Sequence, residues 1–216
     1  MIKKETKTIE EISNMLDKLP SVSLRDFHDK NTTLVIVDMI NGFAREGALH
    51  SSRVEAIIPE ITKLSGACEK LHIEKIAFAD CHTESSTEFG AYPVHCLEGT
   101  SESEVVDEIK AVGGYKLITK NSTNGFLEEK FQKWLGENGD KNTFIITGDC
   151  TDICVQQYAI TLKTWFNMKN RKSRIIVPIN AVETYDSEIH NGDLMNIMAL
   201  YNMIINGIEV VKNINS

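Results

Sequence analysis

The chain has 216 residues, of which 42% are hydrophobic and 25% are charged. This composition is ordinary for a globular protein, and the absence of a Pro-, Gly- or Ser-rich linker favours one main domain. The net charge of −8 argues against nonspecific binding to nucleic acid, which requires basic surfaces. No apolar run approaches the roughly 20 residues of a membrane-spanning helix. We therefore expect a small-molecule partner, no nucleic acid and no membrane.

The cysteine content indicates the compartment. The chain has five cysteines, an odd number, and its positively charged N-terminus is followed by no apolar core of a secretory signal. Free thiols in a reducing environment fit this pattern better than a disulfide framework. A cytoplasmic location is therefore expected.

Apolar, β-branched runs of strand length alternate with segments of helical periodicity. The predicted strands are 33–38, 75–80, 115–120, 143–147 and 174–178, with a short sixth run at 208–212. The predicted helices are 53–72, 103–112, 126–138, 152–168 and 187–205, preceded by a separate amphipathic helix at 8–19. This alternation predicts a three-layer α/β/α sandwich around a mostly parallel sheet of about six strands. We expect an N-terminal helical extension over 1–30 and the main domain over 31–216.

Ionisable residues end three of the predicted strands. These residues are Asp38, Asp80 and Lys120, and the fourth strand leads within a few residues to Cys154. Because a parallel sheet places its ligand crevice at the carboxyl ends of its strands, these side chains are expected to converge on one site.

Cys154 lies where a strand gives way to a helix. A helix N-terminus can lower the pKa of a thiol and favour the nucleophilic thiolate, although a lone cysteine is more often a packing residue. Asp38 can accept the thiol proton, and Lys120 can stabilise the charges that result. The alternative is an Asp–Lys ion pair that only lines the rim of the sheet.

A second group follows the second predicted strand. Asp80 and His82 alternate along an extended segment and can face one ion, and His95 follows in the same region. Two imidazoles and one carboxylate suit Zn²⁺, Mn²⁺ or Fe²⁺. Surface histidines are the alternative interpretation. The remaining histidines, His28, His50, His72 and His190, are expected on the surface or in packing roles.

Three segments together resemble the isochorismatase-like cysteine hydrolases, over about residues 34–211. They are Asp38-Met-Ile-Asn-Gly-Phe43, Lys120 after its strand, and Gly148-Asp-Cys-Thr-Asp-Ile-Cys154-Val. The resemblance implies that Asp38 is a base, Lys120 its partner and Cys154 the nucleophile. It also implies a cis peptide between Asp149 and Cys150, and an oxyanion hole formed by the N–H groups of Cys150 and Cys154.

Within this family, the Asp-x-His and Pro-x-His pairs resemble the metal site of the nicotinamidases. The resemblance implies that Asp80, His82 and His95 bind a divalent metal, with Glu88 as a possible fourth ligand. Zinc is the expected metal, and manganese and iron are the alternatives. It also implies that the ion holds a pyridine nitrogen while Phe43 and Tyr92 pack on the ring. A homo-oligomer is expected by the same resemblance.

The first block departs from the family pattern at two positions. Ile40 stands where a glutamine is usual, and Gly42 stands where an aspartate is usual. We expect these changes to alter the wall of the pocket while leaving the proposed base in place.

The predicted function is hydrolysis of a small carboxamide through a thioester. The expected substrate is nicotinamide, which would give nicotinate and ammonia. Another amide or ureide hydrolase of the family, or an isochorismatase-type ether hydrolase, is the alternative. A non-catalytic binding module that keeps the fold is the alternative of a different class.

Overall fold

A parallel sheet forms the centre of the molecule in the computed structural model, which describes residues 2–27 and 29–216. Met1 and His28 lie outside these residues. The strands run in the order β4-β3-β2-β5-β6-β8, and the short strand β7 pairs with the end of β5. Their bounds are β2 Thr32–Val37, β3 Glu74–Asp80, β4 Tyr115–Lys120, β5 Thr143–Asp149, β6 Arg174–Pro178, β7 Val182–Glu183 and β8 Glu209–Val211. The predicted mostly parallel sheet is confirmed, with β7 as a seventh strand.

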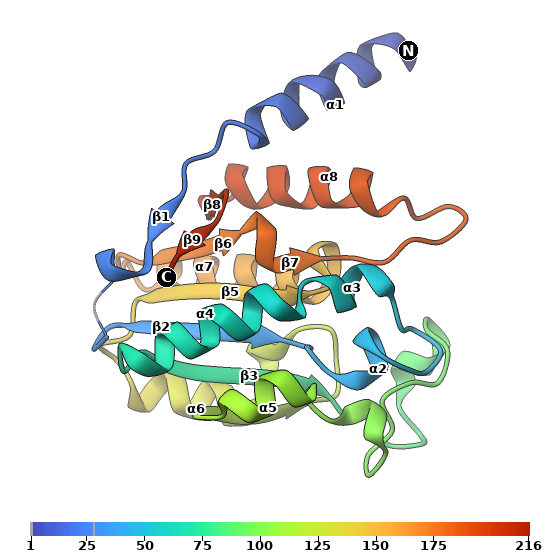
Figure 1. Ribbon diagram of the computed structural model, residues 1–216, viewed down its shortest axis with the longest axis vertical. Helices are drawn as coiled ribbons and strands as arrows, with labels where there is room; N and C mark the ends of the chain where they lie inside the picture. Colours follow the sequence, from blue (N-terminus) through green and yellow to red (C-terminus); the bar gives the residue numbers. More distant parts are fainter. Residues whose placement is uncertain (1, 28) are drawn as a thin grey trace.

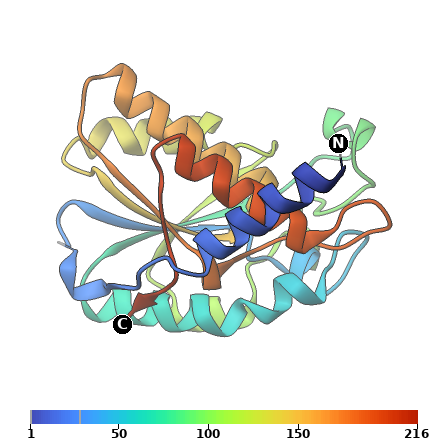
Figure 2. The same ribbon diagram turned by 90° about the horizontal axis from the view of Figure 1, so that it is seen from above.

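Helices cover both faces of the sheet (Figures 1 and 2). One face carries α3 (Ser52–Ala56), α4 (Ile58–Lys70) and α5 (Asp107–Val112), and the other carries α6 (Glu129–Glu137), α7 (Gln156–Met168) and α8 (Gly192–Ile205). Strand β2 serves both layers because its side chains alternate: Val35 and Val37 join one core, while Leu34 and Ile36 join the other. This arrangement confirms the predicted three-layer sandwich.

Short elements connect these layers. They are α2 (Asn41–Ala44), a π-helical turn (Thr151–Val155) and 3₁₀ turns at Leu24–Asp26, Thr87–Gly90, Ser101–Ser103, Gly125–Leu127 and Ile179–Ala181. The N-terminal helix α1 (Ile2–Leu16) lies on the outside of α8 (Figure 2), with Ile12 and Leu16 buried. A two-residue strand β1 (Val22–Ser23) pairs with β9 (Ile214–Asn215). Within the described residues, no helix has the length and apolar character needed to cross a bilayer.

Several helices begin or end away from their predicted limits. The helix predicted at 53–72 is divided at Ile57, and Pro59 lies in the first turn of α4, where its missing N–H is tolerated. The helix predicted at 187–205 begins only at Gly192, because the Asn191 side chain caps it by accepting the Leu194 N–H. The N-terminal helix ends at Leu16 rather than at residue 19, and a tighter turn follows in which Leu19 N–H donates to the Leu16 carbonyl.

The register of the sheet brings four ionisable side chains to one edge. Asp80 on β3 is paired directly with Lys120 on β4. Val37 on β2 is paired with both Phe78 and Gly148, so Asp38 and Asp149 are the next residues on neighbouring strands. The carboxyl ends of β4, β3, β2 and β5 therefore form a row of Lys120, Asp80, Asp38 and Asp149.

Gly148 allows β2 and β5 to approach closely just before this row. Its φ is +112°, and a Cβ built there would lie 1.9 Å from the Val37 carbonyl oxygen. We expect Gly148→Ala to lower the free energy of unfolding by about 3 kcal/mol or more, since both the backbone and the neighbouring strand would have to shift. Gly136→Ala, in helix α6 with open space around it, is the control and should change stability by about 1 kcal/mol or less. Urea denaturation measures both, and similar stabilities for the two variants would contradict this account.

Candidate active site

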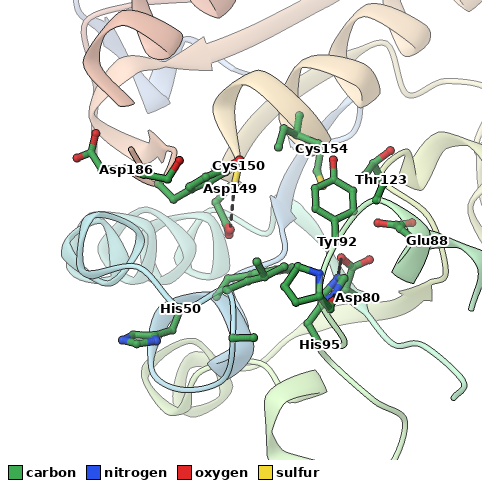
Figure 3. A pocket seen from close by; sticks show the side chains of 18 residues that line it. His50, Asp80, Glu88, Tyr92, His95, Thr123, Asp149, Cys150, Cys154 and Asp186 are labelled. Carbon is green, nitrogen blue, oxygen red and sulfur yellow. Dashed lines mark hydrogen bonds and ion pairs between the residues drawn. The ribbon is translucent and has the colours of Figure 1, made fainter. Parts of the chain in front are cut away.

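A cavity of about 400 Å³ opens at the carboxyl ends of the strands (Figure 3). Its wall combines aromatic and apolar side chains with acids, thiols and imidazoles. The main lining residues are Phe43, Leu49, His50, Asp80, Glu88, Tyr92, Pro93, His95, Thr123, Asp149, Cys150, Ile153, Cys154, Tyr185, Asp186 and Ser187. The cavity therefore collects residues from both halves of the sheet.

Lys120 is the charged centre beneath this cavity. Its side chain is fully buried, and its Nζ lies 2.8 Å from Asp38 Oδ2 and 2.5 Å from Asp80 Oδ1. The same ammonium donates to the Ser122 carbonyl at 3.1 Å and lies 3.7 Å from Cys154 Sγ. The structure thus brings Asp38, Lys120 and Cys154 together, and burial excludes an ion pair that only lines the rim.

Cys154 is held as a thiol in this environment. Burial raises the pKa of the Cys154 thiol well above its usual value, although the charge of Lys120 opposes the shift. The lower pKa expected from a helix N-terminus is therefore wrong for the resting site, because Cys154 lies inside the π-helical turn, where desolvation outweighs that effect. Such a thiol needs a base to become a nucleophile.

Asp38 has the properties of that base. It leaves β2 with a positive φ of 53°, and its backbone conformation is one that Asp tolerates better than most residues. Burial raises the pKa of Asp38 to about 6, while Lys120 opposes the shift. At neutral pH the carboxyl is mostly ionised, yet it is more basic than an exposed aspartate, which suits proton transfer in both directions.

Asp80 connects Lys120 to a second cluster. Its Oδ1 meets the ammonium, while its Oδ2 lies 3.7 Å from His82 Nε2 and 3.8 Å from His95 Nε2. Burial opposes ionisation of Asp80, but the Lys120 charge and its hydrogen-bonding neighbours hold its pKa below the usual value. One atom each from Asp80, His82, Glu88 and His95 lies within 4.8 Å of the others.

This donor set fits a divalent metal ion. His82 Nδ1 donates to Asn121 Oδ1 and His95 Nδ1 donates to the Pro93 carbonyl, each at 2.8 Å. These hydrogen bonds at Nδ1 leave the Nε2 lone pairs directed at Asp80, and hydrogen bonds of this kind orient histidine ligands in metal sites. The Nε2–Oδ2 separations are near the ~3.4 Å expected for two ligands of one tetrahedral zinc ion. Both imidazoles are almost fully buried, which excludes the surface-histidine interpretation.

Aromatic side chains surround the imidazoles. Phe43 and Tyr92, both predicted, line the cavity, with ring centroids 5.7 and 6.1 Å from that of His95. Phe89 was missed, although its ring lies 5.5 Å from His82 and 5.7 Å from His95. Its position one residue after Glu88 is the signal that could have identified it.

The two departures in the first block do not face the cavity. Ile40 is fully buried and forms a β-bridge with Val105, and Gly42 packs against Cys96 and Glu102. A Cβ at position 42 would lie 2.6 Å from Cys96 Sγ, so an aspartate has no room there. The expected change of the pocket wall at these two positions is therefore wrong.

A segment after β7 closes one side of the cavity. Arg53 holds it by donating to the Thr184 carbonyl and to the carboxylates of Asp186 and Glu183. His190 bridges it to the π-helical turn by bonding the Tyr185 carbonyl and Asp152, both at 2.9 Å.

From their place after the fifth predicted strand, residues 180–185 are expected either at the mouth of the site or in a subunit contact, and the structure places Tyr185 at the cavity. Tyr185, Asp186 and Ser187 line the cavity, and His190, expected to be isolated, stacks on Tyr185 at 4.0 Å. His50 also lines the cavity.

The third block has the geometry that its resemblance implied. The Asp149–Cys150 peptide is cis, and Cys150 and Cys154 both line the cavity. Asp149 also lines it, although it was expected only as a member of the cis peptide and not as a site residue.

Comparisons with known proteins agree with this geometry. Residues 32–209 match the model of the Isochorismatase domain. Nicotinamidase 1 of Arabidopsis thaliana is 27% identical in an alignment that covers 87% of this chain and 88% of that protein. The crystal structure of N-carbamoylsarcosine amidase from Thermoplasma acidophilum is 25% identical with a TM-score of 0.68, over 84% of this chain and 96% of that one.

A zinc-bound relative has the same fold. The structure of the pyrazinamidase of Pyrococcus horikoshii in complex with zinc is 23% identical with a TM-score of 0.69, over 84% of this chain and 99% of that one. The chain belongs to the isochorismatase domain family. It is a hydrolase of the cysteine-type family. The similarity to nicotinamidases supports the nicotinamidase-like branch of this family, as predicted from the sequence.

Proposed function

We propose that the protein hydrolyses a small carboxamide, with nicotinamide as the substrate and nicotinate and ammonia as the products. The observation that carries this proposal is that the Asp80–His82–Glu88–His95 cluster and Cys154 meet in one cavity with aromatic walls. Nicotinamide carries a ring nitrogen, which can bind a metal ion, and a carboxamide on the same planar ring, so it has one group for each part of the cavity. The nicotinamidases of Arabidopsis thaliana and Acinetobacter baylyi among the relatives support it.

In the acylation half of the reaction, Asp38 removes the proton from the Cys154 thiol. The thiolate attacks the amide carbon, and the N–H groups of Cys150 and Cys154 stabilise the oxyanion. The C–N bond then breaks, and the nitrogen leaves as ammonia with the proton held by Asp38. The Lys120 ammonium stabilises the negative charge on Asp38 and on Cys154 while the proton moves between them.

In the second half, water releases the acid from the thioester. Asp38, ionised again, accepts a proton from the attacking water, and the new C–O bond replaces the C–S bond. The proton returns to Cys154, which regenerates the thiol that burial favours. In each half-reaction Asp38 therefore acts first as a base, accepting a proton, and then as an acid, releasing it.

The residues that would hold the metal are Asp80, His82, His95 and Glu88. The two imidazoles favour Zn²⁺, while Mn²⁺ and Fe²⁺ accept the same ligands. When bound, the ion supplies a Lewis acid that holds and orients the ring nitrogen of the substrate.

The charge of the cavity supports an uncharged substrate. Among the described residues that line the cavity there is no Lys or Arg, whereas Glu88 and Asp186 contribute carboxylates. Isochorismate carries two carboxylates and would meet no cationic side chain here, so this charge pattern disfavours the ether-hydrolase alternative. The anionic product of amide hydrolysis would be released more readily than the neutral substrate.

A ureide hydrolase is the second candidate, because N-carbamoylsarcosine amidase is among the similar structures. N-Carbamoylsarcosine, the substrate in the name of that amidase, bears one carboxylate, which the acidic cavity disfavours. A panel of amides and ureides assayed for ammonia discriminates the two. A homo-oligomer and a cytoplasmic location stay predictions.

Replacing the nucleophile tests the reaction. We expect Cys154→Ala to reduce ammonia release from nicotinamide by at least about 1,000-fold, because Cys154 is the cavity thiol that lies beside Asp38 and Lys120. Cys81→Ala is the matched control, since Cys81 is outside the cavity lining and should keep activity within about threefold. Retained turnover in Cys154→Ala would refute the nucleophile. An inert Cys154 toward thiol reagents, with no turnover by the wild type, would instead indicate a non-catalytic binding module.

Removing two imidazoles tests the metal site. The double variant His82→Ala/His95→Ala should lose its stoichiometric divalent metal, because only two carboxylates would remain in the cluster. His72→Asn is the control, since His72 is exposed, has a φ of 57° that Asn tolerates, and does not belong to the ligand cluster. Elemental analysis of dialysed protein measures the effect, and unchanged metal content in the double variant would contradict the assignment.

A further inference from the structure

Asp149 is the one carboxylate in the row of strand ends that has no cation in contact. The row contains Asp38, Asp80 and Asp149, but its single ammonium, Lys120, already contacts Asp38 and Asp80. Asp149 has no ion pair with any residue that the structure describes. Its side chain is nevertheless 1% exposed, so solvent does not replace the missing partner. A buried carboxyl group without a partner is costly unless a ligand completes it.

The Asp149 carboxyl group faces the substrate cavity (Figure 3). Among the residues that the structure describes, its side chain has one hydrogen bond, a weak one in which the Cys150 thiol donates to Oδ2 at 3.8 Å. Oδ1 has no hydrogen-bond partner within the described chain. A buried acceptor that lines a cavity and lacks a protein donor is positioned to accept a hydrogen bond from the ligand.

The other acids of the cavity have partners already. Asp80 is bound by Lys120 and faces the imidazoles, and Glu88 belongs to the same ligand cluster. Asp186 accepts from Arg53 and from the Gly192 N–H. Only Asp149 among them keeps a buried oxygen for the substrate, and it immediately precedes Cys150, a proposed oxyanion donor.

We propose that Asp149 is a specificity-determining residue whose Oδ1 accepts a hydrogen bond from the N–H of a primary carboxamide held at Cys154. This inference rests on the proposed function and narrows its substrate class. Figure 3 places Asp149 across the cavity from Asp80 and His95. A substrate anchored at the ligand cluster and extending past Cys154 therefore presents its leaving-group nitrogen to Asp149.

The chemistry of the group favours an amide over an ester. Burial, reinforced by the nearby charge of Asp38, raises the pKa of Asp149 well above its usual value, which favours the neutral carboxyl. A neutral carboxyl has both an acceptor and a donor, as a primary amide does. An ester of the same acid has no N–H, and it would leave the buried Oδ1 unpaired.

Comparing two substrates with one acyl group tests the inference. Nicotinamide and methyl nicotinate would form the same thioester, so their kcat/KM ratio reports the leaving-group side of the site. Asp149→Leu removes the acceptor, and we expect the amide-to-ester ratio to fall by about 10- to 100-fold. Asp149→Asn keeps an acceptor of the same shape, and its ratio should stay within about threefold of the wild type. If the Leu variant does not fold, Asp149→Ala removes the same acceptor with less bulk.

The outcomes separate this inference from the proposed function. Failure of the wild type to hydrolyse either compound would refute the proposed function itself. Wild-type turnover with an unchanged ratio in the Leu or Ala variant would overturn the role of Asp149 while leaving the reaction intact. Equal losses on both substrates would also overturn it, because they indicate a structural role. A lower ratio in the Leu or Ala variant, restored in the Asn variant, supports the inference.

Discussion

The buried ammonium of Lys120 is the interaction on which the rest of the site depends. Removing such a charge from water is unfavourable by several kcal/mol unless opposite charges accompany it, and here the carboxylates of Asp38 and Asp80 do so at 2.8 and 2.5 Å. The three residues end three adjacent parallel strands, so the register of the sheet fixes their separation. Loss of the lysine would leave two like charges buried together.

This arrangement joins the nucleophile to the ligand cluster. Asp38 faces Cys154, while Asp80 uses one oxygen for Lys120 and presents the other to His82 and His95. A shift of the Lys120 side chain would therefore disturb both the base and the cluster. The row of strand ends has one ammonium for three acidic side chains, and Lys120 contacts Asp38 and Asp80. This explains why Asp149, in the same row, has no ion pair with it. Its unpaired oxygen, rather than a further ion pair, faces the substrate.

Much of this site could be predicted because strand ends in a parallel sheet converge. Asp38, Asp80, Lys120 and Cys154 were all identified from their positions after apolar runs. The Asp-x-His and Pro-x-His pairs indicated His82 and His95, and Glu88 came from the family resemblance alone. Asp149 was missed because β5 continues two residues beyond its predicted end, which brings that carboxyl to the edge of the sheet. For the segment that ends at Tyr185, the sequence left open the mouth of the site or a subunit contact. The segment is positioned by Arg53, 132 residues before Tyr185, and no local pattern signals such a contact. The raised pKa of Cys154 likewise depends on tertiary burial, which a strand-to-helix junction does not reveal.

Peptide mapping of enzyme quenched in acid during turnover of nicotinamide tests the central claim most directly. Cys150 and Cys154 are only four residues apart, so fragment ions must separate them. The account predicts one nicotinoyl group, attached to the Cys154 sulfur and absent when substrate is omitted. A nicotinoyl group on Cys150, or steady formation of nicotinate with no acylated peptide, would contradict the account.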